Sequence, residues 1–164
     1  MQAPSHVLIA AGLTSAAISI GIFPDGHGAA AIVPYAAAIA GSLLPDVDHP
    51  RSWAGKRIWP VSAIIGMIFG HRGITHSLVA AIALGLLAAV LPLGASPTWI
   101  FPLGFGYLSH LVADWMTPSG IPLLWPVRKS FICPVVQIRT GSITEKLISA
   151  AFLGLVILRM VIPR

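Results

Sequence analysis

Long apolar runs separated by short connections dominate the pattern of the chain. Five of these runs are long enough, or nearly long enough, to cross the hydrocarbon core of a bilayer as helices, which takes roughly 20 residues each. They cover residues 6–23, 27–44, 74–93, 98–116 and 143–162. The pattern predicts an all-α fold, a polytopic membrane helix bundle with four or five transmembrane helices.

A sixth apolar run, residues 58–70, is too short to span a bilayer and contains Pro60 and Gly66. A run of this kind suits a helix that lies at the membrane interface or re-enters the membrane from one side. We therefore expect a short re-entrant or interfacial segment between the second and third spans.

The connections carry residues that end helices. Proline occurs with glycine or aspartate in residues 23–26, 44–46, 91–94 and 117–120, and proline lacks the amide donor that a continuing helix needs. Ser142 and Glu145 have the spacing of a capping box, which predicts that the last helix begins there.

The composition supports a membrane location. Of the 164 residues, 56% are hydrophobic and 9% are charged, whereas an ordinary soluble domain carries charge on about 25% of its residues. The length leaves room for a single integral membrane domain, residues 1–164, and none for a second, soluble one. The one cysteine, Cys133, excludes an internal disulfide framework and a thiolate-rich metal site.

The positive charge belongs mostly to the connections. The net charge is +5, but the basic residues are few, so we expect contacts with anionic lipid head groups and no nucleic-acid partner. The two long connections hold most of them, which places both loops and the N-terminus in the cytoplasm. Residues 1–5 lack the positive charge of a signal peptide, so the first run is expected to remain as a mature helix. Arg159 falls on the opposite side in a five-span arrangement, against the charge rule.

The rare ionisable side chains gather at the cytoplasmic ends of the predicted helices. Such groups are costly at membrane depth, and their convergence from four segments indicates a site. Imidazole nitrogens and carboxylate oxygens are ligands of divalent metals. The candidate metal ligands are His6, Asp46, Asp48, His49, His71, His76, His110 and Asp114. They exceed the four ligands of a single zinc ion, so we expect one or two divalent ions per chain, zinc first, with manganese or magnesium as alternatives.

Spacing adds detail to this site. His110 and Asp114 are four residues apart and share one face of a helix. His71 and His76 are too far apart around a helix to share a face, so we place His71 on the first turn and His76 within the helix. Arg72 carries a planar cationic fork suited to phosphate. Hydroxyl groups that could orient the imidazoles lie at Thr75, Ser77 and Ser109.

Each part of the site also has a simpler interpretation. His110 with Asp114 alone could be a buried hydrogen-bonded pair, His6 alone a residue at a helix end, and residues 46–49 alone a solvated turn. Two ionisable residues at the opposite end of the bundle are interpreted as ordinary loop residues, Asp25 and His27.

Ser109, His110 and Asp114 include the residue types of a nucleophilic triad. Adjacent residues point about 100° apart around a helix, so His110 is poorly placed to act as the base for Ser109. A serine hydrolase is therefore disfavoured.

Three ordered blocks combine these residues: 41–49 (GSLLPDVDH), 71–77 (HRGITHS) and 106–120 (GYLSHLVADWMTPSG), followed by Leu-Trp-Pro at 124–126. Over roughly residues 6–126 the chain resembles the YdjM-type family of bacterial and archaeal membrane-bound proteins, described as metal-dependent hydrolases. The resemblance implies an inner-membrane location and a distant likeness to zinc-dependent phospholipase C, an all-helical enzyme whose His and Asp ligands hold zinc ions. Carried over by position, it implies as ligands Asp46, His49, His71, His76, His110 and Asp114, with His6 and Asp48 as further candidates.

These observations favour a membrane-bound metal-dependent hydrolase that acts on a phosphoester of a lipid at the cytoplasmic face. A bound metal would lower the pKa of water and stabilise charge on the phosphoryl oxygens. Asp48 or Asp46, whichever is not a ligand, is the expected general base. Arg72, with Lys56 or Arg57, is expected to bind the substrate phosphate.

A non-enzymatic membrane protein with a structural or sensing metal site is the main alternative, and the residues do not separate it from a hydrolase. A metal transporter is disfavoured, because transport sites lie near the bilayer midplane and involve both sides. The ionisable residues of this chain gather at one boundary.

Overall fold

The computed structural model describes the chain except for residues 71, 91–96, 128 and 163–164. Within the described residues the regular elements are helices, and pairing of extended chain is limited to one isolated bridge between Ile121 and Phe131. The predicted all-α class is therefore confirmed.

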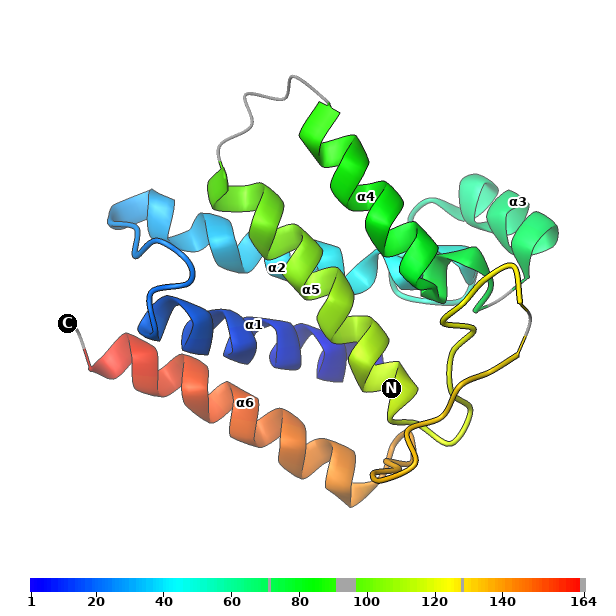
Figure 1. The fold of residues 1–164 in the computed structure, drawn as a ribbon. Coiled ribbons are helices and arrows are strands. Elements are labelled where there is room, and N and C mark those ends of the chain that lie inside the picture. Colours follow the sequence, from blue (N-terminus) through cyan, green and yellow to red (C-terminus); the bar gives the residue numbers. More distant parts are fainter. Residues whose placement is uncertain (71, 91–96, 128, 163–164) are drawn as a thin grey trace.

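Three helices that contact one another form the centre of the bundle (Figure 1): α1 (Ala3–Ser19), α2 (Val33–Leu43) and α5 (Pro97–Trp115). Helix α6 (Ile143–Val161) packs along α1 at the edge of this group. Helix α2 packs along α5, and α1 contacts both α2 and α6. Ala10 of α1 and Ala38 of α2 are fully buried in this centre, whereas apolar side chains of α6 such as Leu147 and Ile157 are exposed.

Glycines set the close approach of α2 and α5. A Cβ atom on Gly41 would lie 2.0 Å from the carbonyl oxygen of Leu103, and one on Gly106 would lie 1.9 Å from the carbonyl oxygen of Ala38. A side chain at either position would force the two backbones apart, whereas glycine lets them meet. The crossing places the end of α2 beside the last turns of α5.

Two helices lie outside this centre. Helix α4 (Leu78–Val90) packs against α5, where Ala80 and Leu84 contact a cluster that includes Tyr107 and Leu111. Helix α3 (Trp59–Phe69) lies at the edge of the molecule beside the turn η2 (Pro45–Asp48) (Figure 1). With 11 residues, α3 is about 16 Å long and too short to span a bilayer, as predicted for residues 58–70.

Helices occur at all five predicted spans, but the number of membrane crossings is not established by their lengths. Among the described residues, one helical stretch is long and apolar enough to cross a membrane by length and composition, residues 28–48, which run from η1 (Gly28–Ile32) through α2 to η2. Three further apolar helices are shorter, at Ala3–Ser19, Trp59–Phe69 and Leu78–Leu87. The four or five spans therefore remain a prediction.

Helix α2 ends at Leu43, close to the predicted end at residue 44, and the separate turn η2 follows it, since proline is tolerated in the first turn of a helical segment. One helix start differs from the prediction, and it carries a site residue. His76 lies in the short turn η3 (Ile74–His76) and not within α4. Ser77 separates the two with an extended backbone, and its Oγ accepts a 3.3 Å hydrogen bond from the amide of Ala80, which caps α4.

An ion pair joins Asp25 to Arg159 at the far end of the bundle. Asp25 and His27 are both exposed in the loop before η1, as predicted, and Asp25 in addition pairs with Arg159.

Candidate metal centre

Five ionisable side chains meet at the end of the bundle where α2 and α5 finish. His6 comes from α1, Asp46 from η2 and His76 from η3, while His110 and Asp114 lie in the last two turns of α5. Asp46 is 19% exposed, and the other four are at most 2% exposed. The structure thus brings together residues from four segments that are far apart in the sequence.

Two imidazole nitrogens form the centre of this group. His76 Nε2 and His110 Nε2 are 3.3 Å apart, and each lies 3.8 Å from Asp46 Oδ1. The distances from the same two nitrogens to Asp114 Oδ2 are 3.8 and 3.9 Å. Ligands around a tetrahedral zinc ion are separated by about 3.4 Å, given bonds of about 2.1 Å. Shifts of a few tenths of an ångström would therefore let the two nitrogens and either one of these carboxylate oxygens share one ion.

Hydrogen bonds fix which nitrogen of each ring faces the group. His110 Nδ1 lies 2.6 Å from the carbonyl oxygen of Ser42 and donates to it, so the Nε2 of the neutral ring carries a lone pair. His76 Nδ1 faces Asp48 Oδ2 at 3.4 Å, which likewise favours a proton on Nδ1. Two lone pairs directed at each other over 3.3 Å repel, and a cation between them would turn both into ligands.

His6 completes the group from the side of α1. Its ring stacks on that of His110, with centroids 3.7 Å apart and planes inclined by 12°. His6 Nε2 lies 3.3 Å from Asp114 Oδ1, but within the described part of the chain neither ring nitrogen makes a hydrogen bond. A buried imidazole without hydrogen bonds is unusual and costly. The residues present therefore fit a divalent metal ion.

The candidate ligands form two overlapping groups. One consists of His6, His110 and Asp114, and the other of Asp46, His76 and His110. His110 belongs to both, and its Nδ1 is engaged with Ser42, so only Nε2 is available. Because one nitrogen binds one ion, the two groups do not form two independent sites. The arrangement suits a single ion that draws ligands from both.

Arg72 binds the same carboxylate that faces the histidines. Its NH2 donates to Asp114 Oδ2 at 2.8 Å, and its NH1 contacts Ser119 Oγ and lies 3.3 Å from the carbonyl oxygen of Gly120. The backbone of Arg72 has a φ of 58°, an unfavourable conformation for a residue with a side chain. Its amide donates to Asp48 Oδ2 at 2.9 Å, which helps to hold this conformation.

Asp48 orients neighbouring groups from a buried position. Besides the amide of Arg72, its Oδ2 accepts a 2.6 Å hydrogen bond from Thr75 Oγ1 and faces His76 Nδ1. The hydroxyl of Tyr107 donates to the carbonyl oxygen of Thr75 and ties η3 to α5. Asp48 thus supports the position of His76, as carboxylates beside metal-binding histidines commonly do.

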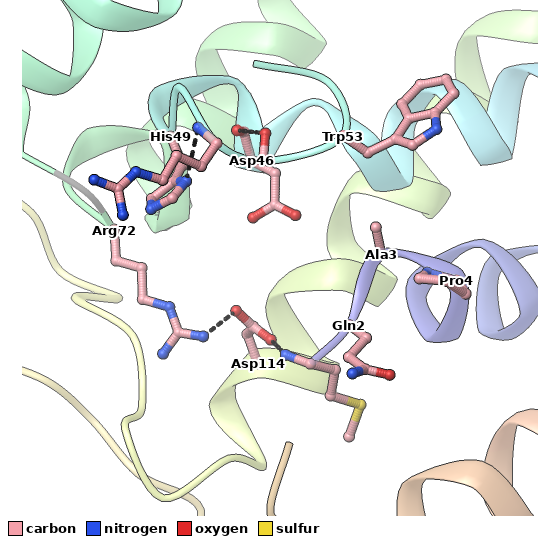
Figure 2. Close-up of a pocket in the computed structure, with 11 residues that line it drawn as sticks. Gln2, Ala3, Pro4, Asp46, His49, Trp53, Arg72 and Asp114 are labelled. Atoms are coloured by element: carbon pink, nitrogen blue, oxygen red, sulfur yellow. Dashed lines mark hydrogen bonds and ion pairs between the residues drawn. The ribbon is translucent and has the colours of Figure 1, made fainter. Parts of the chain in front are cut away.

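A cavity of about 480 Å³ opens beside the candidate ligands. Figure 2 shows Asp46 and His49 on one side of it and Arg72 extending toward Asp114 on the other. The remaining lining comes from residues 1–4 and from Arg51, Ser52 and Trp53. A carboxylate from each ligand group and two arginines therefore face one small space, which suits an anion bound next to a metal.

Several predicted site residues take other positions. His49 lines the cavity, where its Nδ1 accepts a hydrogen bond from the amide of Arg51, but it lies outside both ligand groups. Arg57 stacks on the ring of Trp53 at 3.5 Å, and neither it nor Lys56 lines the cavity. His71 lies outside the described residues.

Two of the three predicted orienting hydroxyls bond to backbone carbonyls. Ser77 Oγ donates to the carbonyl oxygen of Ile74, and Ser109 Oγ donates to that of Gly106 at 2.7 Å. Thr75 alone of the three contacts the imidazole group, with its Oγ1 3.1 Å from His76 Nδ1. The bond from Ser109 within its own helix also agrees with the argument against a serine nucleophile.

The sequence prediction missed Arg51 and the role of Glu145. Glu145 is buried, and its carboxylate accepts hydrogen bonds from the amides of Gln2 (2.7 Å) and Gly141 (2.5 Å). The capping pattern correctly predicted that Ser142 Oγ accepts from the Glu145 amide. The carboxylate, however, ties the start of α6 to the start of α1 and so steadies one wall of the cavity. Arg51 lines the cavity. Its position two residues after the predicted ligand His49 could have indicated a further cation at the site.

The fold and the site define a helical protein with a membrane-type composition and a buried histidine–aspartate centre. Residues 1–163 match the family model described as YdjM inner membrane protein, and the chain belongs to this family. The family resemblance noted from the sequence is thereby confirmed.

Relatives occur in several bacteria. The inner membrane protein YdjM of Escherichia coli (strain K12) is 44% identical over 126 residues, which cover 73% of this chain and 62% of that protein. A protein of Bacillus subtilis (strain 168), YvsG, is 30% identical over 152 residues, 92% of this chain and 88% of its own length. The inner membrane protein YbcI of Escherichia coli (strain K12) is 35% identical over 97 residues, 55% of this chain and 51% of that protein. The chain thus spans less than two thirds of the Escherichia coli YdjM protein. No solved structure matches the chain, and the likeness to zinc-dependent phospholipase C remains a prediction.

Proposed function

We propose that this protein is a metal-dependent hydrolase of the bacterial inner membrane that cleaves a phosphoester of a lipid at the cytoplasmic face. The observation that carries the proposal is the convergence of His76 Nε2 and His110 Nε2 with two carboxylates beside a cavity that also contains Arg72. Family membership supports the membrane location. A multi-pass topology with the site toward the cytoplasm follows from the charges of the connections.

One ion bound by His76 and His110 together with Asp46 or Asp114, and with His6 beside them, is the arrangement of the proposal. When bound, a divalent cation supplies Lewis acidity to a water molecule and to a phosphoryl oxygen. The mixed nitrogen and oxygen donors suit zinc and leave manganese as the main alternative.

The protein's own groups divide the remaining work. The guanidinium of Arg72 binds the phosphate, and Arg51 adds positive charge at the opening of the same cavity. His49 lines the cavity outside both ligand groups. His49, or Asp46 where Asp46 is not a ligand, is placed to take the proton of the attacking water. Asp48 acts through His76, which it orients from a buried position. Lys56 and Arg57 contribute to the attraction of anionic lipid outside the cavity.

A structural or sensing metal centre is the second candidate. The observation that favours it is the burial of His6, His76, His110 and Asp114, which leaves Asp46 as the most exposed of the five candidate ligands. A closed structural centre has all its ligand positions filled by side chains, whereas a catalytic centre keeps one open.

Metal analysis of the purified full chain, combined with a hydrolysis screen over phospholipids and polyprenyl phosphates, tests the proposal. We expect about one divalent ion per chain, and turnover of a lipid phosphoester that requires this ion. His76→Ala should remove both the metal and the activity, while His27→Ala, at the far end of the bundle, should change neither. Metal-replete protein that hydrolyses no phosphoester would favour the structural centre.

A further inference from the structure

Arg72 separates two cavities. One is the site cavity of about 480 Å³ described above, and the other is a groove of about 560 Å³ between the end of α3 and the loop after α5. We call the second the α3 groove; its lining includes Met67, Phe69, Ser119, Trp125 and Ser130. Arg72 lines both spaces, and each has the volume of a typical small-ligand pocket.

The guanidinium of Arg72 makes hydrogen bonds toward both the site cavity and the α3 groove. Its NH2 reaches Asp114 in the site cavity, and its NH1 reaches Ser119 and Gly120 at the edge of the α3 groove. A phosphate bound at this guanidinium therefore has space on two sides. A phosphate with one substituent would use one of the cavities, and a phosphate with two substituents would use both.

The α3 groove is amphiphilic. Its outer edge is the last turn of α3, where Met67 and Ile68 are 84% and 62% exposed. Its inner wall carries the hydroxyls of Ser119 and Ser130 and the cation of Arg72. An apolar rim next to polar groups matches the glycerol region of a lipid, where acyl chains meet ester oxygens and phosphate.

We propose that a phospholipid binds astride Arg72, with its phosphate at the guanidinium, its head group in the site cavity and its glycerol backbone in the α3 groove. This rests on the proposed function and makes the substrate a phosphodiester of the surrounding membrane. Hydrolysis then breaks one of the two ester P–O bonds, adds the hydroxyl of water to phosphorus and leaves the proton of water on the departing alcohol.

Binding measurements on the metal-loaded full chain in detergent test this arrangement. The probes are dihexanoyl phosphatidylethanolamine, glycerophosphoethanolamine and phosphoethanolamine, which have a complete diester, a deacylated diester and a monoester. We expect each diester to bind about tenfold more tightly than the monoester. Ser130→Trp, which fills the α3 groove from an exposed position, should weaken diester binding about tenfold and leave monoester binding within about twofold.

Matched controls separate the groove from general damage. Gln137→Trp places the same side chain on an exposed part of the same loop outside the groove. It should not change the binding of any of the three probes. Met67→Glu, at the groove rim, should weaken binding of the dihexanoyl lipid more than binding of the other two probes. Ile64→Glu, exposed on the same helix but outside the groove lining, should not weaken binding of this lipid.

The outcomes distinguish this inference from the proposed function. If the variants weaken diester binding as expected but no phosphoester is hydrolysed, the subsite stands and the hydrolase proposal fails. If a phosphoester is hydrolysed while Ser130→Trp and Met67→Glu bind every probe like the unmodified protein, the hydrolase proposal stands and the subsite is wrong.

Discussion

At His110, hydrogen bonding decides which ring nitrogen faces the candidate metal centre. The bond from Nδ1 to the carbonyl oxygen of Ser42 leaves Nε2 facing His76 and the two carboxylates. Asp48 has the matching role for His76. The geometry of the candidate centre therefore depends on residues outside both ligand groups.

Asp48→Asn tests this dependence. The amide keeps the size of the carboxylate but loses its charge, so His76 is held less firmly and its nitrogen is a weaker donor. We expect the affinity for zinc to fall about 10- to 100-fold, measured by competition with a chelator of known affinity. Asp25→Asn, a carboxylate in the far ion pair, is the control. Unchanged affinity in Asp48→Asn would show that Asp48 has no part in metal binding.

Residue spacing predicted part of this centre. His110 and Asp114 share a helix face because four residues nearly complete a turn, and their side chains do lie 3.9 Å apart. The contact between His76 and His110 depends on the placement of η3 beside α5, which spacing within one segment does not determine. His49 shows the same limit, since its turn directs it to the cavity wall and not to the ligand groups.

At the scale of helices, the crossing of α2 and α5 controls the centre. The apolar runs predicted the helices themselves, including the short α3. It did not predict that Gly41 and Gly106 sit at the crossing, because a glycine in an apolar run gives no sign of what it faces. The ends of segments were also harder to predict, and His76 is in η3 because Ser77 starts α4 later than expected.

Gly106→Ala should disrupt the crossing. Its Cβ would lie 1.9 Å from the carbonyl oxygen of Ala38, so the helices must separate and His110 must move relative to Ser42. We expect the free energy of unfolding in detergent to fall by about 1–3 kcal/mol or more, and we expect the affinity for metal to fall with it.

Gly104→Ala is the matched control on the same helix, because a Cβ there would meet nothing within 4 Å. It should be neutral or stabilise the helix by about 0.5–1 kcal/mol. Thermal unfolding followed by circular dichroism compares the two variants, and equal stability of both would contradict the described crossing.

For the molecule as a whole, the positions of the charges predict the orientation of the bundle in the membrane. Both the centre and the two long connections lie at one end, and the Asp25–Arg159 pair lies at the other. The distribution of basic residues predicts that the first of these ends faces the cytoplasm.

Labelling of single cysteines with a membrane-impermeant reagent checks this orientation. In a background with Cys133→Ser, Arg51→Cys and Pro118→Cys should react only from the cytoplasmic side. His27→Cys, exposed at the other end, should react only from the opposite side. Labelling of residues 51 and 118 from different sides would contradict the predicted topology.

A shared ligand has a consequence for stability. Because His110 belongs to both groups, an ion held there would connect residue 6 to residue 114 and both to the turns between them. The chain has a single cysteine and cannot form an internal disulfide, whereas an ion that binds the folded state alone would add its binding free energy to the free energy of unfolding. Resistance to unfolding would then be set by the metal supply of the cell as much as by the packing of the helices.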